Sequence, residues 1–462
     1  MTREIVTKQV KLAAHFPGVN NTTVWSDPRS GSQIDFASFE HLATTAERGK
    51  FDFIFLAEGL RLREHAGKIL DSDVVGRPNT TTVLAALSLV TTRLGLAGTL
   101  SSTFNEPYEV ARQMSTLDHL SGGRAAWNVV TSPDAWTGKN FRRGGFLKRE
   151  DRYQRAEEFL RTVRELWGSW APDALVGDKE RGVFAADAGI RHFVHSGPQF
   201  EIEGEFTLPR TPQGQPIIIQ AGDSDEGREF AASSADVIFS RHGSLEDGKA
   251  FFHDVKRRLA GYGREHSDLL IMPAATFVLG DTAEEAHEYA REISYQQVRP
   301  ATAIQFLEQV WSRDLSAYDA DGPLPEIDPD PDAEPLTWGR VRHEKDQVAL
   351  ATKWRAIAEE KKLSIRELVI EVTARQQFVG TARQVAETIN EYVQSDAADG
   401  FVLVPHLTPG GLDGFVDTVV PHLQELGVFR ADYEGATLRE HLGLKPPDFQ
   451  PVAPALRATA IK

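Results

Sequence analysis

The chain has 462 residues, more than a single hydrophobic core usually holds, so we expect either one large barrel with insertions or two domains. Lysine and arginine number 51 against 67 aspartates and glutamates, and this net charge of −16 disfavours nucleic acid or an anionic membrane as a partner. The absence of cysteine excludes disulfides, thiolate nucleophiles and cysteine-ligated metal sites.

The N-terminal residues MTREIVTKQV carry charges and no long apolar run, unlike a secretory signal peptide. No uninterrupted apolar segment reaches the roughly 18 residues of a membrane span, so we expect no transmembrane helix. The sequence therefore predicts a cytoplasmic protein.

Strands and helices alternate along the first third of the chain. The hydrophobic patterns predict strands at 10–14, 51–57 and 94–100, and helices at 36–46, 80–90 and 107–120. Gly122 and Gly123 follow the last of these helices and permit a left-handed stop and a chain reversal. The apolar run at 125–130 is the fourth predicted strand, and the hydroxyl residues Thr131 and Ser132 follow it.

The same alternation continues to the end of the chain. It predicts strands at 216–220, 235–239, 269–278 and 400–405, and helices at 149–170, 245–259, 382–393 and 414–426. Eight strand-then-helix units in this order are typical of a (β/α)8 TIM barrel. We therefore expect one barrel domain over residues 1–446 and a C-terminal tail at 447–462.

Two stretches interrupt this rhythm, one after the fourth strand and one after the seventh. Residues 171–214 predict a small β excursion. Residues 281–380 include an acidic, proline-rich piece at 319–335, whose composition predicts an exposed loop. An insertion on the C-terminal face of a barrel is expected to form a lid over the site, and a solvent-exposed decoration is the alternative.

The segment AGDSDEG, residues 221–227, leaves a predicted buried strand and enters a helix. Gly222 allows close approach of the backbone to a ligand, and Ser224 can cap the helix, whose first N–H groups attract anions. This pattern predicts a phosphate site, and a plain helix cap is the alternative. Asp223 and Asp225 disfavour a highly charged polyphosphate.

Single histidines are candidates for proton exchange or for donation to an oxyanion, and a structural hydrogen bond is the alternative for each. These are His15, His242 and His343. His192 and His195 lie three residues apart, so on a strand they would point to opposite faces, and a surface hairpin is favoured over a metal site. No nucleophile-elbow, P-loop, zinc-protease or dinucleotide fingerprint occurs, so a mononucleotide on a barrel fits best.

The segments EPYEVARQMSTLDHLSGGRAAWNVVTS, NFRRGGF and DRYQRAEEF together resemble the bacterial luciferase-like flavin monooxygenases. AEGLRLREH, DVVGRPNT and QAGDSDEGREFAA fit the branch that contains nitrilotriacetate monooxygenase component A, dibenzothiophene sulfone monooxygenase and pristinamycin synthase. The resemblance covers residues 8–446. It implies a (β/α)8 barrel that takes reduced FMN from a separate NAD(P)H:FMN reductase. It further implies that O2 adds at flavin C4a and that the peroxide oxidises a small organic substrate, such as an aminopolycarboxylate or an organosulfur compound. A homodimer or homotetramer is usual in this family.

The resemblance also implies roles for individual residues. His15 falls on the substrate side as the catalytic candidate, and Glu58 falls where relatives commonly have an aspartate near the flavin. The remaining implied FMN contacts are, at the ring, Thr99, Ser101, Asn128 and Val129, and at the phosphate end, Tyr153, Ala221, Gly222, Asp223 and Ser224.

Other functions stay open at this level. An F420-dependent oxidoreductase or a non-catalytic flavin-binding protein would use the same barrel, and a metal-dependent hydrolase would need more His and carboxylate ligands at strand ends than the sequence offers. The substrate is also open. Arg61, Arg63 and His65 either hold an acidic substrate or belong to a solvated charged loop.

Overall fold

The computed structural model describes residues 7–18, 20–70, 73–132, 135–141, 149–339, 346–374 and 377–449. Within these residues the main sheet has the strand order β13-β12-β11-β6-β5-β2-β1-β17-β14-β16, with parallel pairing throughout. Its strands are β1 (Lys11–Phe16), β2 (Phe53–Leu56), β5 (Gly95–Ser101), β6 (Ala125–Val130), β11 (Ile217–Ala221), β12 (Val237–Phe239), β13 (Leu270–Ile271), β14 (Ala274–Leu279), β16 (Gln377–Gly380) and β17 (Gly400–Leu403).

The seventh predicted strand, 269–278, is interrupted in the structure. β13 pairs with β12, whereas β14 pairs with β17 and β16. The Met272 N–H donates to the Ile238 carbonyl (2.9 Å), and the Pro273 carbonyl accepts from the Val402 N–H (2.9 Å). Proline has no N–H to donate, which accounts for the break in the ladder. The stretch 270–279 thus pairs with β12 near one end of the strand order and with β17 and β16 near the other end. The fold is TIM-barrel-like.

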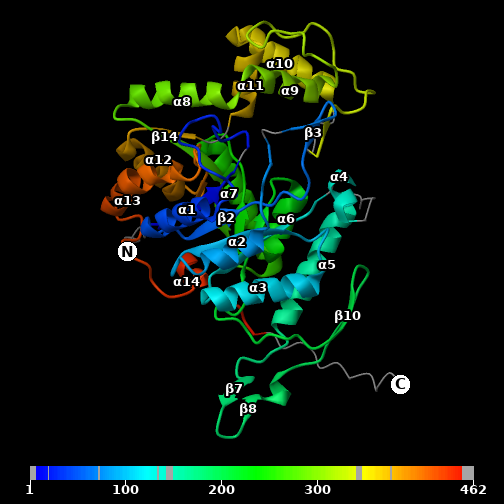
Figure 1. Cartoon of the computed structure of the whole chain (residues 1–462). Helices are drawn as coiled ribbons and strands as arrows, with labels where there is room; N and C mark the ends of the chain where they lie inside the picture. Colours follow the sequence, from blue (N-terminus) through cyan, green and yellow to red (C-terminus); the bar gives the residue numbers. More distant parts are fainter. Residues whose placement is uncertain are drawn as a thin grey trace.

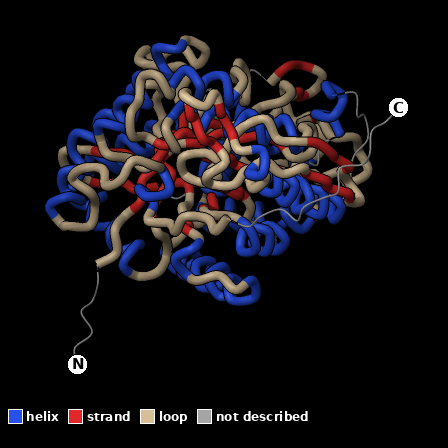
Figure 2. Tube along the Cα trace, turned by 90° about the horizontal axis from the view of Figure 1, so that it is seen from below, coloured by secondary structure: helices blue, strands red, loops and turns tan. Residues whose placement is uncertain are grey.

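Figure 2 shows the strands gathered in the middle of the molecule with helices outside them. One apolar cluster, with Ile54, Leu96 and Trp127, lies between strands and helices, and a second, with Phe53 and Ala97, lies on the opposite strand face. This is the two-residue alternation of a barrel wall. No helix within the described residues is both long and apolar enough to cross a membrane. The surrounding helices are α1 (Phe36–Arg48), α2 (Thr80–Leu87), α3 (Pro107–Ser121), α5 (Arg149–Trp167), α6 (Asp225–Ser234), α7 (Leu245–Leu259), α12 (Ala382–Gln394) and α13 (Val420–Glu425).

The predicted reversal after α3 is present. Gly122 caps the helix in the left-handed region (φ 68°), and Gly123 follows with φ 92°. A Cβ on Gly123 would lie 2.7 Å from Thr437 Cγ2, so the position has no room for a side chain. The Asp118 carboxylate accepts from the Ala125 N–H (3.0 Å) and so fixes the start of β6.

Residues 171–214 hold two antiparallel hairpins, which project at the opposite end of the molecule from α8 (Ala283–Gln297) in Figure 1. β9 packs against α5, which ties the second hairpin to the barrel. The hairpin strands are β7 (Leu175–Asp178), β8 (Val183–Ala185), β9 (Phe193–Ser196) and β10 (Glu201–Gly204).

The predicted insertion 281–380 only partly leaves the barrel, because α8 packs on β14 and β16, and β16 belongs to the main sheet. The helices that follow α8 have their own apolar cluster around Leu307 and Trp311. The acidic piece 319–335 is largely exposed, yet Arg355 donates to the Pro325 carbonyl (3.1 Å) and Trp311 donates to the Ile327 carbonyl (2.8 Å). A short β15 (Thr337–Trp338) pairs with β3 (Glu64–His65), which in turn pairs with β4 (Lys68–Ile69). The helices are α8 (Ala283–Gln297), α9 (Pro300–Trp311), α10 (Gln347–Lys361) and α11 (Ile365–Thr373), all at the top of Figure 1.

Candidate active site

Five neighbouring parallel strands, β11, β6, β5, β2 and β1, end at one edge of the barrel. Their registers align the predicted positions, because Thr99 pairs with Asn128 and Asn128 pairs with Ile219, two residues before Ala221. Ligands of parallel α/β proteins bind at this edge. The structure therefore brings the sequence-predicted residues of these strands to a common rim.

Side chains on the interior face of this rim are polar and aromatic. Phe55 belongs to the interior cluster and stacks on Phe239, with ring centroids 5.4 Å apart. His15 lies edge-on to Phe55 (5.5 Å), and its Nδ1 is 3.3 Å from the Phe55 carbonyl oxygen. The aromatic surfaces offer a wall suited to a flat, partly apolar ligand.

Asn128 and Thr99 form a buried cross-strand pair, in which Asn128 Nδ2 donates to Thr99 Oγ1 (3.0 Å). Asn128 Oδ1 is buried and has no hydrogen-bond partner among the described residues, so it can accept from a ligand. Val129 points the other way, into the apolar cluster beneath the helices. Only its backbone can reach a ligand inside the barrel.

Glu58 lies two residues beyond the end of β2, and its Oε2 is buried with no partner in the part of the chain that the structure describes. Burial raises the pKa of the Glu58 carboxyl to about 7, and the Ser101 N–H acts in the opposite direction. Ser101 is itself fully buried, and its Oγ lies 3.1 Å from Ser132 Oγ. At neutral pH, Glu58 can thus hold or release a proton at the rim.

The predicted phosphate turn adopts the expected geometry. Ser224 caps α6, its Oγ accepting from the Gly227 N–H (3.2 Å), and Tyr153 of α5 places its hydroxyl 3.5 Å from the same Oγ. A Cβ on Gly222 would approach Gly227 Cα at 3.4 Å and Gln220 Nε2 at 3.3 Å. Glycine thus keeps this turn open toward the free N–H groups of the helix.

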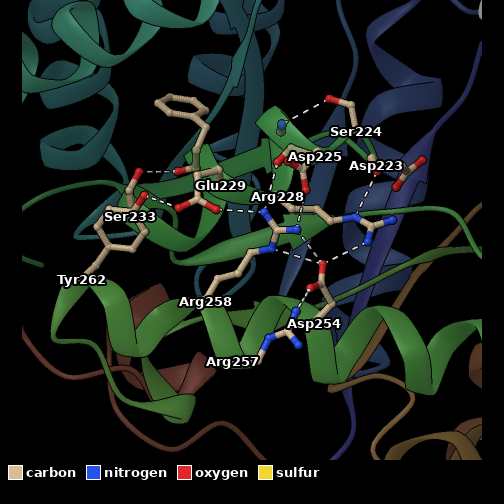
Figure 3. A network of polar contacts seen from close by, with 12 residues as sticks. Asp223, Ser224, Asp225, Arg228, Glu229, Ser233, Asp254, Arg257, Arg258 and Tyr262 are labelled. Carbon is tan, nitrogen blue, oxygen red and sulfur yellow. Dashed lines mark hydrogen bonds and ion pairs between the residues drawn. The ribbon is translucent and has the colours of Figure 1, made fainter.

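Figure 3 shows that the acidic residues of the turn already have cationic or N–H partners. The Asp223 carboxylate accepts from the Arg241 N–H (3.1 Å), and Arg228 donates to the Asp223 carbonyl (3.1 Å). Arg258 binds Asp225, and both arginines also contact Asp254. These contacts fix the turn from the α7 side and offset the acidic charge that disfavours a phosphate.

The other histidines have structural partners. His242 lies 3.0 Å from Ser240 Oγ, and burial lowers its pKa to about 4, so it is neutral at pH 7. His195 is not on a surface hairpin face, because it is buried between Glu158 and Glu165 of α5 (3.1 Å each). His192 lies beside Glu203 and Glu205, and no cluster of three possible metal ligands occurs among the described residues. His343 lies outside those residues.

The three basic side chains of the loop after Glu58 all have partners within the described residues. The Arg61 guanidinium lies 3.5 Å from the centre of the Trp136 ring and donates to the Trp136 carbonyl. Arg63 is ion-paired with Asp73. His65 joins Glu308 Oε2 (2.6 Å) and Thr337 Oγ1 (2.8 Å) of the helical insertion. These side chains connect the loop to its surroundings.

Sequence reasoning missed three residues of this rim. Phe55 and Phe239 lie within apolar runs of the sequence, which do not single them out as site residues. Phe55 lies two residues after the inward-facing Phe53 on the same strand, so the two side chains share the interior face. Gln220 directly precedes the phosphate turn, and its Oε1 is buried without a partner. A polar side chain inside a strand of isoleucines was the available signal.

The chain matches the family model of luciferase-like monooxygenases over residues 18–399 and belongs to that family. It is 40% identical to N-acetyl-S-(2-succino)cysteine monooxygenase of Bacillus subtilis (strain 168), covering 95% of this chain and 98% of that one. It is 37% identical to nitrilotriacetate monooxygenase component A of Aminobacter aminovorans, covering 91% and 92%. A crystal structure of riboflavin lyase with modified FMN and riboflavin is 29% identical, with a TM-score of 0.78 over 95% of this chain and 97% of that one.

Proposed function

We propose that this protein is a two-component, FMN-dependent monooxygenase that uses reduced FMN and O2 to oxidise a small organic substrate. A separate NAD(P)H:FMN reductase supplies the reduced flavin. Two of the similar proteins support this assignment. One is nitrilotriacetate monooxygenase component A, whose name indicates a second component, and the other is riboflavin lyase, whose crystal structure holds modified FMN. Since these similar relatives are flavin enzymes or monooxygenases, an F420-dependent or non-catalytic role has less support.

The observation that carries the proposal is one rim with two complementary ends. The turn at Gly222 and Ser224 offers a hydroxyl, free helix N–H groups and the Tyr153 hydroxyl, which suit a single phosphate. The interior face offers the aromatic wall and the unpaired Asn128 oxygen, which suit a flat ring with N–H groups. These residues fit FMN.

When bound, FMN supplies the activation of oxygen, and this explains why the site needs no nucleophile triad or metal set. The protein's own residues bind and orient the ring, and the Glu58 carboxyl, whose pKa is about 7, can accept or donate a proton beside it at neutral pH. Exclusion of water protects reactive species, and the insertion at 281–380 is placed to provide it, because β3 and β15 connect it to the loop after β2.

We also infer that the stretch 270–279 closes an eight-stranded barrel, in which β13 and β14 count as one strand and β16 is an added strand beside β14. The segments 171–214 and 281–380 are then insertions in one domain over 1–446. The bonds from this stretch to both β12 and β17 support closure. A homodimer or homotetramer in the cytoplasm is the corresponding assembly, and light scattering of the purified chain measures its mass.

Formation of an oxidised product tests the function. Photoreduced FMN alone, added anaerobically and then exposed to O2 with candidate amines, sulfur compounds and carboxylates, should give hydroxylated or cleaved product only when this chain is present. The same product should form with NADH, FMN and a flavin reductase. Turnover with reduced F420 but not with reduced FMN would contradict the proposal.

A further inference from the structure

A cavity of about 210 Å³ lies between the helical insertion and the loop that follows β1. Residues 20–26 of that loop form one wall, and the end of α8 with one face of α9 forms the other. On α9, Thr302, Gln305 and Gln309 face the cavity, whereas Leu307 is buried in the apolar cluster of the insertion. A space of this size holds a small organic molecule.

Polar side chains without partners gather around this cavity. Five of them form no hydrogen bond with any described residue: Trp25, Ser26, Gln296, Thr302 and Gln305. Trp25, Ser26 and Gln296 are exposed to solvent, whereas Thr302 and Gln305 are half-buried. Two glutamine amides, two hydroxyls and an indole N–H are thus available to a ligand from both walls. Convergent polar groups in a hollow with an apolar part, here Leu70 and Phe306, are typical of a binding site for a small molecule.

Two charged side chains line the cavity among the described residues, and they differ in whether an ion pair compensates them. Asp73 and Arg299 are the charged residues among the described ones that line it. Asp73 is ion-paired with Arg63, whereas Arg299 has no ion-pair partner within the described residues. One positive charge is therefore uncompensated, at the start of α9, where the helix dipole also favours an anion.

The loop wall of the cavity follows β1, whose last residues reach the rim that we assign to the flavin. This wall begins at Asn20, which donates to the Pro17 carbonyl (3.0 Å), two residues after His15. Gln297 at the end of α8 donates to the Thr22 carbonyl (2.7 Å) and joins the two walls. A molecule in the cavity therefore lies on the side of the barrel mouth where β1 ends.

We propose that this cavity is the substrate site and that it selects small organic acids with one carboxylate and with neutral oxygen-bearing groups such as amides or sulfonyls. Arg299 binds the carboxylate, and the unpaired amides and hydroxyls bind the neutral groups. A second or third carboxylate would face neutral amides or the Asp73 carboxylate, so it would gain no cationic partner and would be repelled by Asp73. This inference rests on the function proposed above.

Calorimetric titration of the FMN-loaded protein tests the charge selection. The ligands are N-acetylmethionine, its methyl ester and nitrilotriacetate, which carry one, no and three carboxyl groups. We expect the monoacid to bind at least tenfold more tightly than the ester and than nitrilotriacetate. Arg299→Gln should remove this advantage and leave the ester unchanged. Arg291→Gln is the matched control, because Arg291 is exposed on α8 and does not line the cavity.

A second variant tests the polar wall. Gln305→Leu should weaken the acid and the ester by the same factor, because it removes an amide and leaves Arg299 in place. Equal binding of acid and ester, tighter binding of nitrilotriacetate, no binding of any of the three, or no effect of Arg299→Gln would overturn the inference. Quenching of FMN fluorescence is measured for every variant. Failure of the unaltered chain to bind FMN contradicts the proposed function, whereas failure of substrate selection with FMN bound contradicts this inference alone.

Discussion

Burial of the Glu58 carboxyl makes it a pH-dependent residue at the rim. Its pKa rises from an ordinary 4.5 to about 7, so between these values the folded state binds more protons than the unfolded state. The free energy of unfolding therefore falls as pH rises from 4.5 to 7.

We expect Glu58→Gln to remove this dependence. Relative to the unaltered chain, the variant should gain on the order of 1–3 kcal/mol between pH 5 and pH 8, because glutamine has no proton to lose. Urea unfolding at both pH values measures the change. Glu359→Gln, at an exposed position of α10, is the control and should show no such gain. A gain that is equal at both pH values would refute the assignment.

The Ser224 hydroxyl has two roles that a substitution can separate. As the cap of α6 it should contribute about 1 kcal/mol to stability. As a phosphate contact it should contribute about a further tenfold to FMN affinity, or about 1.4 kcal/mol.

Ser224→Ala should therefore lower both the melting temperature and FMN affinity, measured by fluorescence quenching. Ser244→Ala is a matched control, because Ser244 caps α7 in the same way but lies outside the turn. It should lower stability alone. Equal FMN affinity in the two variants would show that the turn does not bind phosphate.

At the scale of elements, the helical insertion is fastened to the loop after β2 by a buried contact. Glu308 of α9 binds His65 Nε2 (2.6 Å) and accepts from the Leu315 N–H (2.8 Å). Both groups lose their partner in Glu308→Ala, which should cost about 2–4 kcal/mol.

Glu308→Ala removes this buried contact between the insertion and the loop after β2. It should therefore make residues 281–380 sensitive to limited proteolysis well before the barrel. Mass spectrometry of the fragments locates the cuts. Glu292→Ala, at an exposed site on α8, should digest like the unaltered chain. Cleavage that begins in the barrel helices would argue against a locally fastened insertion.

The rhythm of strands and helices was predictable because barrel strands alternate and helices repeat every 3.6 residues. The predicted helix at 245–259 coincides with α7. The split at Pro273 was not predicted, since the apolar run continues across it and only its pairing with two different strands separates the halves. The partners of Arg61 and His65 could not be predicted from the sequence either, because they lie about 75 and 240 residues away along the chain.

At the scale of the whole molecule, the barrel end opposite the rim is closed by the short helix α14 (Leu438–Leu442). Leu438 is fully buried in the interior cluster, and a Cβ on Gly95 would lie 2.6 Å from its side chain. This end stabilises the fold, whereas the opposite rim is where we propose that FMN binds.

Leu438→Ala should accordingly destabilise the chain by about 2–5 kcal/mol, because it leaves a cavity that the strands cannot fill. Denaturant unfolding measures the loss. FMN affinity at a temperature where the variant is folded should not change. A large change in FMN affinity would show that the two ends of the barrel are coupled.

A crystal structure of the chain with FMN tests the central claim most directly. We predict the phosphate within hydrogen-bond distance of Ser224 and Tyr153, and the flavin ring beside Asn128 and Glu58. A flavin bound at another face of the barrel, or one whose phosphate lies away from the turn at Ser224, would contradict the account.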